Sequence, residues 1–175
     1  MDEGRGPAPL ILTLRMDTNS FARLDALRRA HFPPERNHLS AHLTLFHALP
    51  GDAEAEVAAN LGTLCAGTAP MPLRVAGLRS LGRGVAFVVE GAALPKLRGM
   101  LADAWHGWLT PQDRQGFRPH VTVQNKVDPA EARALLAALE SGFTPWEMRG
   151  EGLLLWRYRG GPWEAAGEFP FLGKG

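Results

Sequence analysis

The sequence predicts a duplicated fold of strands and helices, in which two similar halves meet at a central groove with approximate two-fold symmetry. Three observations lead to this prediction. Strand and helix patterns follow one another in the same order twice along the chain. Each half contains one His-x-Thr tripeptide within an apolar frame, and the two histidines, His42 and His120, lie 78 residues apart. An arginine stands six residues before each histidine, at Arg36 and at Arg114.

The first half carries alternating signals for strands and helices. Phe21, Leu24 and Leu27 recur at helical spacing after Ser20, which is a good N-cap residue, and Pro33 ends this helix. The expected elements are, in order, a strand at 10–16, a helix from Ser20 to Pro33, a loop at 35–41, the strand of His42, a helix over about 53–65 and a strand around 73–78.

The second half repeats this order and then adds a hairpin. Asp128, Pro129 and Glu131 form a helix start signal, with Asp as cap and Pro at the first position. Gly160 and Gly161 predict the turn of the hairpin. The expected elements are, in order, a strand at 85–90, a helix at 94–108, a loop at 110–119, the strand of His120, a helix ending at Gly142, and strand-like segments at 146–148, 153–158 and 163–171.

Length and composition limit the class of protein. A chain of 175 residues suits one domain over residues 1–175, with internal repeats at about 9–82 and 83–172. The net charge of +1 creates no strong field for nucleic acid, so local groups must hold any anionic ligand. Cys65 is the only cysteine, which fits a reducing compartment. Residues 1–8 resemble a frayed tail rather than a signal peptide, and no apolar run approaches the ~18 residues of a membrane span. We expect a cytoplasmic monomer with no membrane partner.

The paired motifs suggest chemistry at a phosphate. Side chains at positions i and i+2 of a strand point to the same side, so His42 is expected to face with Thr44, and His120 with Thr122. Two imidazoles and two hydroxyls in one space could hold a phosphate between an acid and a base. A single histidine of this kind would more often be a core residue bonded to backbone, whereas the matched pair favours a functional role.

Residues around the motifs are candidates for substrate binding. Those that could line the groove, stack on a base or hold phosphates are Phe46, Gln124, Phe117, Arg36, Arg114, Arg118 and Lys126. The structural alternatives are rim packing for the aromatic residues and solvation for the basic ones. His31, His47 and His106 are expected to be structural or exposed, and the five tryptophans are expected to pack in the interior. We expect no metal site, because no carboxylate cluster lies near either motif and two histidines with two hydroxyls make a poor zinc site.

The motifs His42-Leu-Thr-Leu-Phe and Pro119-His120-Val-Thr-Val, about 80 residues apart in a duplicated strand–helix unit, are similar to those of the 2H phosphoesterase superfamily. The chain resembles its bacterial 2′,5′ RNA ligase-like members, whose relatives include RNA 2′,3′-cyclic phosphodiesterases, over about residues 10–171. This resemblance implies an α+β fold that is bilobal and pseudo-two-fold, with antiparallel sheets flanking a central cleft and helices outside.

The resemblance also implies a reaction. His42, Thr44, His120 and Thr122 would form the catalytic set without a cofactor, with His42 as general acid and His120 as general base in cyclic-phosphate opening. The implied activity is hydrolysis of 2′,3′-cyclic phosphates or 2′,5′ linkages of RNA or a small nucleotide, with RNA ligation as the reverse reaction. Relatives often carry an arginine shortly after the second motif, where this chain has Gln124-Asn125-Lys126. The absence of this arginine weakens the implied ligation and the implied contacts to a second nucleotide more than it weakens the implied hydrolysis.

Two other classes remain open at this point. The chain could be a non-catalytic protein that binds RNA ends or nucleotides in the same groove, or a structural repeat protein with no ligand. Turnover separates the enzyme from both, and the orientation of the two histidines separates the binder from the structural protein.

Overall fold

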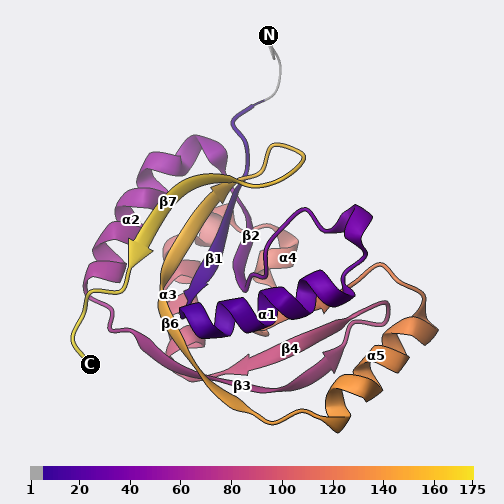
Figure 1. The fold of residues 1–175 in the computed structure, drawn as a ribbon. Helices are drawn as coiled ribbons and strands as arrows, with labels where there is room; N and C mark the ends of the chain where they lie inside the picture. The colour runs from indigo at the N-terminus through magenta and orange to yellow at the C-terminus, as the bar shows by residue number, and fades with distance from the viewer. Residues whose placement is uncertain (1–5) are drawn as a thin grey trace.

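The computed structural model describes residues 6–175, and residues 1–5 of the expected N-terminal tail lie outside them. In the described residues helices surround a curved antiparallel sheet, which confirms the α+β class (Figure 1). The strands are β1 (Leu10–Met16), β2 (Thr44–Leu49), β3 (Met71–Ser80), β4 (Val85–Glu90), β5 (His120–Gln124), β6 (Trp146–Arg157) and β7 (Glu164–Pro170). The helices are α1 (Thr18–His31), α2 (Glu54–Ala66), α3 (Ala93–Ala104), α4 (Pro111–Arg114) and α5 (Pro129–Ser141).

The strands form one sheet, in which β6 is the strand that both halves share. The sheet order is β2-β1-β6-β3-β4-β5, and β7 also pairs with β6. The first residues of β6 pair with β3, at Trp146 opposite Val75, and its later residues lie between β1 and β7, at Leu153 between Leu14 and Phe169. This long strand replaces the two short segments expected at 146–148 and 153–158, and it joins the two halves into one hydrogen-bonded unit.

Two arginines connect each half of the chain, by hydrogen bonds, to the strand of the other half that contains a motif threonine. We call these two strands, β2 and β5, the motif strands. Arg28 on α1 is 4% exposed, and its guanidinium donates to the carbonyl oxygen of Thr122 on β5 at 3.0 Å. Arg98 on α3 donates to the carbonyl oxygen of Leu45 on β2 at 3.2 Å. A buried guanidinium is costly unless its donors are paired, so these bonds restrict how the motif strands lie relative to the helices.

Each motif strand contains a bulge directly after its threonine. Opposite β1, Leu12 pairs with Phe46 and Thr13 with Thr44, so Leu45 is an extra residue. Opposite β4, Val85 pairs with Gln124 and Ala86 with Thr122, which leaves one extra residue in β5 as well. The bulges interrupt the inward–outward alternation, and two consecutive residues therefore point into the core in each strand.

Some helices begin or end at other residues than the sequence predicts. Helix α1 begins one turn earlier than expected, because Asp17 rather than Ser20 is the N-cap and its carboxylate accepts from the Ser20 amide at 2.9 Å. Helix α3 ends at Ala104, and the loop expected at 110–119 contains the short helix α4. The hairpin expected at the C-terminus is confirmed by the antiparallel pairing of β6 with β7. No helix among residues 6–175 has the length and apolar character needed to cross a membrane.

The bulge of β5 leads to a stability prediction at Gly84. A Cβ built on Gly84 would lie 2.0 Å from the backbone oxygen of Gln124, whereas one on Gly99, in α3, meets nothing within 4 Å. We expect Gly84→Ala to lower the free energy of unfolding by about 1–3 kcal/mol, because backbone must shift. Gly99→Ala should raise it by about 0.5–1 kcal/mol, because alanine is the better residue in a helix interior. Denaturant unfolding measures both, and an unchanged Gly84→Ala midpoint would contradict the close approach.

Candidate active site

The two motif histidines are held in the same way. The Nδ1 atom of His42 lies 2.8 Å from the Ser40 carbonyl oxygen, and the Nδ1 atom of His120 lies 2.7 Å from the Arg118 carbonyl oxygen. Because a carbonyl only accepts, each Nδ1 must carry the proton and donate it. In the neutral form of each ring, Nε2 is then left as a free acceptor. Both imidazoles are thus oriented as bases, and each becomes an acid when Nε2 is protonated.

The alternation of buried and half-buried side chains expected within the motifs is observed, although β2 begins at Thr44 and His42 precedes it instead of lying in the strand. Leu43 and Val121, which follow the two histidines, are fully buried in the core. His42, Thr44, His120 and Thr122 are all half-buried, on the other side of the chain. The polar residues of both motifs therefore lie at the surface of the core rather than inside it.

Burial lowers the pKa of both histidines. Desolvation, together with the positive charges of Arg28, His120 and His47, lowers the pKa of His42 to about 4, and the bond to the Ser40 carbonyl opposes this only in part. Desolvation also lowers the pKa of His120, and the charges of Arg79 and His47 act in the same direction. Each proton added here meets existing positive charge, so both rings are neutral near pH 7 and would be protonated more easily once an anion binds.

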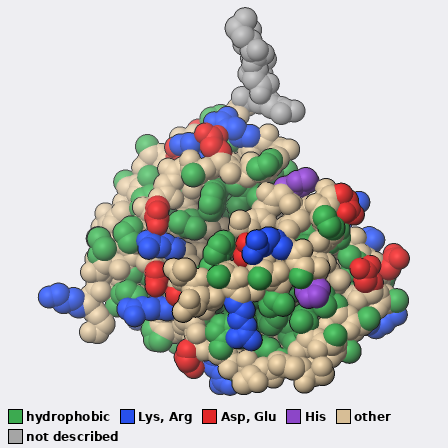
Figure 2. All heavy atoms as spheres, viewed as in Figure 1, with side chains coloured by type: hydrophobic (Ala, Val, Ile, Leu, Met, Phe, Trp, Pro, Cys, Tyr) green, Lys and Arg blue, Asp and Glu red, His purple; other side chains and the backbone are tan. Residues whose placement is uncertain are grey.

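His42 and His120 line two different hollows, yet the two rings are close enough for the charge of His120 to lower the pKa of His42. His120 and Thr44, which come from different halves of the chain, line a hollow of about 580 Å³. Phe117 and Arg118 line the same hollow. On the face drawn in Figure 2, basic and acidic side chains are interspersed, and neither kind forms a continuous patch.

His42 lines the second hollow, which has a volume of about 460 Å³. Its aromatic lining includes Phe21, Trp156 and Trp163, and the rings of Trp163 and His42 lie 4.7 Å apart between centroids. Trp156 is fixed by a hydrogen bond from its Nε1 to the Thr13 hydroxyl at 2.9 Å. Flat aromatic surfaces beside a polar imidazole can bind a ring such as a nucleobase.

Phe46 and Gln124 do not line either hollow. The bulges turn both side chains inward: Phe46 is completely buried against Trp105, and Gln124 is 3% exposed. A buried ring presents no face to a base, so the stacking role expected of Phe46 is wrong. The Oε1 atom of Gln124 has no hydrogen-bond partner among the described residues. The expectation failed because it counted alternation across a position where the strand holds an extra residue.

The other expected contacts lie further away or face solvent. Arg36, Arg114 and Lys126 are exposed and line neither hollow. Lys126 has a backbone φ of 63° in the turn after β5. Thr122 also lines neither hollow, although its backbone oxygen accepts from Arg28.

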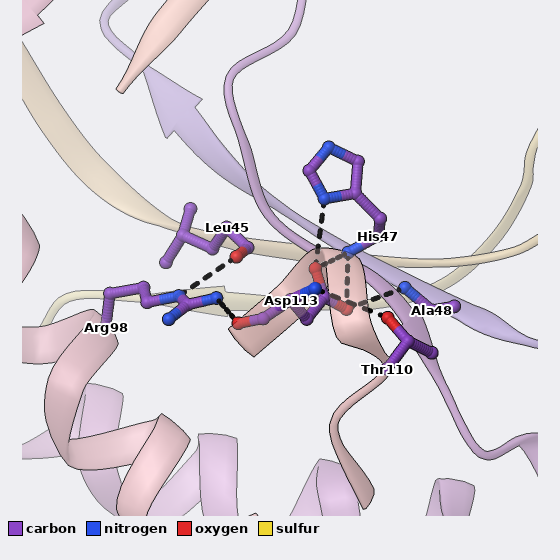
Figure 3. Close-up of polar contacts among 6 residues, drawn as sticks. All are labelled: Leu45, His47, Ala48, Arg98, Thr110 and Asp113. Carbon is purple, nitrogen blue, oxygen red and sulfur yellow. Dashed lines mark hydrogen bonds and ion pairs between the residues drawn. The ribbon is translucent and has the colours of Figure 1, made fainter. Parts of the chain in front are cut away.

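A histidine and a carboxylate that sequence patterns did not single out are paired at the larger hollow. His47 lines it, and its Nδ1 lies 3.0 Å from Oδ1 of Asp113 (Figure 3). Asp113 also accepts from the backbone N–H groups of His47 and Ala48, at 2.9–3.0 Å. Local patterns carry little signal for this pair, because α4 and β2 are far apart in the chain. Arg79, Arg98, Trp156 and Trp163 were overlooked for the same reason.

Donor groups for a metal ion are not gathered at this site. Among residues 6–175 no three His, Cys, Asp or Glu side chains cluster in a way that could hold one. Of the described residues, Asp113 is the only carboxylate of the larger hollow, and Glu168 is the only one of the smaller.

Comparison with known proteins places this chain in a family. A family model described as the 2'-5' RNA ligase superfamily matches residues 16–162. The chain therefore belongs to the 2'-5' RNA ligase superfamily, and the resemblance to 2H phosphoesterases is confirmed. No curated protein sequence matches the chain closely enough to add a nearer relative.

Solved structures agree with this fold. The protein TT0787 of Thermus thermophilus is 19% identical with a TM-score of 0.65, over 95% of this chain and 100% of that one. A protein described as a phosphoesterase is 19% identical with a TM-score of 0.63, over 97% and 100%. E. coli LigT complexed with ATP is 20% identical with a TM-score of 0.61, over 97% and 100%. LigT also matches in its complexes with 3'-AMP, NADP+ and phosphate.

The low pKa of His42 gives a prediction for stability against pH. The folded value of about 4 lies below the ordinary 6.5, so between pH 6.5 and 4 the unfolded chain binds more protons than the folded one. This part of the stability is therefore complete above pH 6.5 and is lost as the pH falls toward 4. It amounts to about 2–3 kcal/mol, allowing for solvent screening of the half-buried ring.

We expect the stability of His42→Gln to fall less than that of the parent when denaturant unfolding is repeated at pH 7 and at pH 4.5. His106→Gln, which changes an exposed histidine outside both hollows, should behave like the parent. Equal losses in His42→Gln and in the parent would show that His42 titrates normally.

Proposed function

We propose that this chain is a metal-independent phosphoesterase that opens 2′,3′-cyclic phosphates, or cleaves 2′,5′ phosphodiester bonds, of RNA or small nucleotides. The observation that carries this proposal is the matched restraint of the two histidines, each with Nδ1 bonded to the carbonyl two residues earlier and Nε2 left free. His120 lies beside the Thr44 hydroxyl of the opposite half, and His42 precedes that threonine by two residues. Two imidazoles with free Nε2 atoms in this arrangement are suited to acid–base catalysis at one phosphorus atom bound between them.

The proposed reaction is an in-line displacement at phosphorus. One neutral imidazole accepts a proton from the attacking water, and the protonated imidazole gives a proton to the leaving sugar oxygen. Thr44 and Thr122 donate hydrogen bonds to the non-bridging oxygens, whose negative charge increases in the transition state. Because atoms and protons balance within water, substrate and the two imidazoles, the reaction needs no redox partner. If a 5′-hydroxyl attacked the cyclic phosphate in place of water, the same displacement would join the two RNA ends, with one sugar oxygen of the cyclic phosphate as the leaving group.

The roles of the two histidines have two possible assignments. The family resemblance makes His42 the acid and His120 the base. The pKa of about 4 for His42 in the free protein favours the opposite assignment, because a ring this reluctant to hold a proton is suited to be the initial base. A bound phosphate would raise the pKa of both rings, so the assignment depends on the complex.

The two hollows support a nucleotide as the substrate. The hollow beside His42 offers Trp156 and Trp163 for a base, and the hollow beside His120 carries arginines suited to phosphate. Structures of LigT, which has the same fold, are complexes with ATP and 3'-AMP. A non-catalytic nucleotide binder is the second candidate, because both histidines have lowered pKa values and neither is protonated near pH 7 in the free protein.

Turnover of a 2′,3′-cyclic nucleotide in EDTA tests the enzyme against the binder. We expect hydrolysis in EDTA, and a loss of about 10²–10⁴-fold in kcat for His42→Ala and for His120→Ala, because each removes one proton transfer. Thr44→Val should lower kcat by about tenfold or more, because it removes a donor to the growing charge. His106→Ala serves as the matched control and should keep parental activity.

Two outcomes would contradict the enzyme. Activity that disappears with EDTA and returns with a divalent ion would overturn metal independence. Nucleotide binding without any turnover by the parent, retained in both alanine variants, would instead support the non-catalytic binder.

A further inference from the structure

The larger hollow, beside His120, has more room than one phosphate requires. Its volume is about 580 Å³, close to that of twenty water molecules at about 30 Å³ each, whereas a phosphate has only five heavy atoms. Three arginines line it besides His47 and His120, namely Arg79 from β3, Arg98 from α3 and Arg118 from the segment before β5. This concentration of positive charge on one hollow is not explained by a single reacting phosphate.

Two of the arginines of the hollow, Arg79 and Arg118, are not paired with a carboxylate among the described residues. The one carboxylate that these residues supply to the hollow, Asp113, has a side chain with 0% exposure, and both oxygens accept N–H groups of His47 and Ala48. Burial raises the pKa of Asp113, but the hydrogen bonds from the side chain and backbone of His47 and from Ala48 outweigh this and lower it, so the group is charged.

Arg98 and His47 are fixed in place. The guanidinium of Arg98 donates to the backbone oxygens of Leu45 and Asp113, at 3.2 and 2.5 Å (Figure 3). It also lies over the rings of Phe46 and Phe117. The ring of His47 is held by Asp113, while its side chain remains 44% exposed. Bonding of Nδ1 to the carboxylate leaves Nε2, on the opposite side of the ring, free for a ligand.

The bulge in β2 is what brings His47 to this hollow. Without the extra residue Leu45, regular alternation from Thr44 would place Phe46, not His47, on the same side. Thr44 and His47 instead line the hollow together, so a ligand phosphate at His47 would lie beside the reacting one at Thr44 and His120.

On the basis of the function proposed above, we propose that His47, with Arg79 and Arg118, binds a second phosphate of the substrate, and that Asp113 positions His47 for this contact. The preferred substrate is then a cyclic nucleotide with a further phosphate, either a terminal phosphomonoester or the phosphodiester that joins the next nucleotide of an RNA. Asp113 is a positioning residue, since it reaches the ligand only through His47.

Binding of stable products tests this subsite independently of turnover. Calorimetry compares adenosine 2′-phosphate with adenosine 2′,5′-bisphosphate on the intact chain. We expect the parent to bind the bisphosphate about tenfold more tightly, the effect of one charge-assisted contact. His47→Gln should abolish most of this gain, and so should Arg79→Gln, which keeps the experiment decisive if one variant folds poorly. His106→Gln is the matched control and should keep the whole gain.

Kinetics then separates the two sources of the second phosphate. Steady-state rates compare adenosine 2′,3′-cyclic phosphate with its 5′-phosphorylated form and with the dinucleotide ApA ending in a cyclic phosphate. A lower KM for either extended substrate, lost in His47→Gln, supports the subsite and identifies that substrate as its source. Equal affinity of the parent for the mono- and bisphosphate, or a full gain retained in His47→Gln, would overturn it. A bisphosphate preference without any turnover would refute the phosphoesterase proposal and leave the subsite standing.

Discussion

The site depends on one backbone restraint that occurs twice, the hydrogen bond from a histidine Nδ1 to the carbonyl two residues earlier. At His42 and at His120 this bond measures 2.8 and 2.7 Å. It fixes the ring plane and the tautomer together, because a carbonyl can only accept. An imidazole held in this way is ready to exchange a proton through Nε2 without first losing rotamer freedom, which is the advantage of a preorganised catalytic group.

The remaining architecture brings the two restrained rings near each other. Strand β6 is shared by both halves, and the buried core forms one continuous cluster across them. Arg28 and Arg98 reach across from the helix of one half to the motif strand of the other. These bonds are charge-assisted and largely shielded from water, so displacement of either motif strand would leave a guanidinium short of partners. The relative position of the motifs is therefore fixed by the core and by hydrogen bonds, and it does not require a ligand.

Much of the fold could be predicted from sequence because its signals are local. The apolar run of β4, the helix start at Pro129 and the Gly160 turn depend on a few neighbouring residues, and the structure places each where expected. The predicted alternation of buried and surface-facing side chains was also correct from His42 to Thr44 and from His120 to Thr122. Beyond them the prediction failed, since a bulge depends on pairing with another strand and leaves no mark in the strand itself. That single extra residue exchanged the expected places of Phe46 and His47. The pairs His47–Asp113 and His42–Trp163 join distant segments, and no local pattern predicts them.

The proposed mechanism requires that both imidazoles donate from Nδ1 and present Nε2 to the same phosphate. Nitrogen NMR of the histidine rings, recorded on the parent with and without inorganic phosphate, tests this most directly. We expect neutral His42 and His120 both to be Nδ1–H tautomers, and a single bound phosphate to shift the Nε2 resonances of both rings together and to raise both pKa values. An Nε2–H tautomer at either position, or a phosphate that shifts one ring and leaves the other unchanged, would contradict the mechanism.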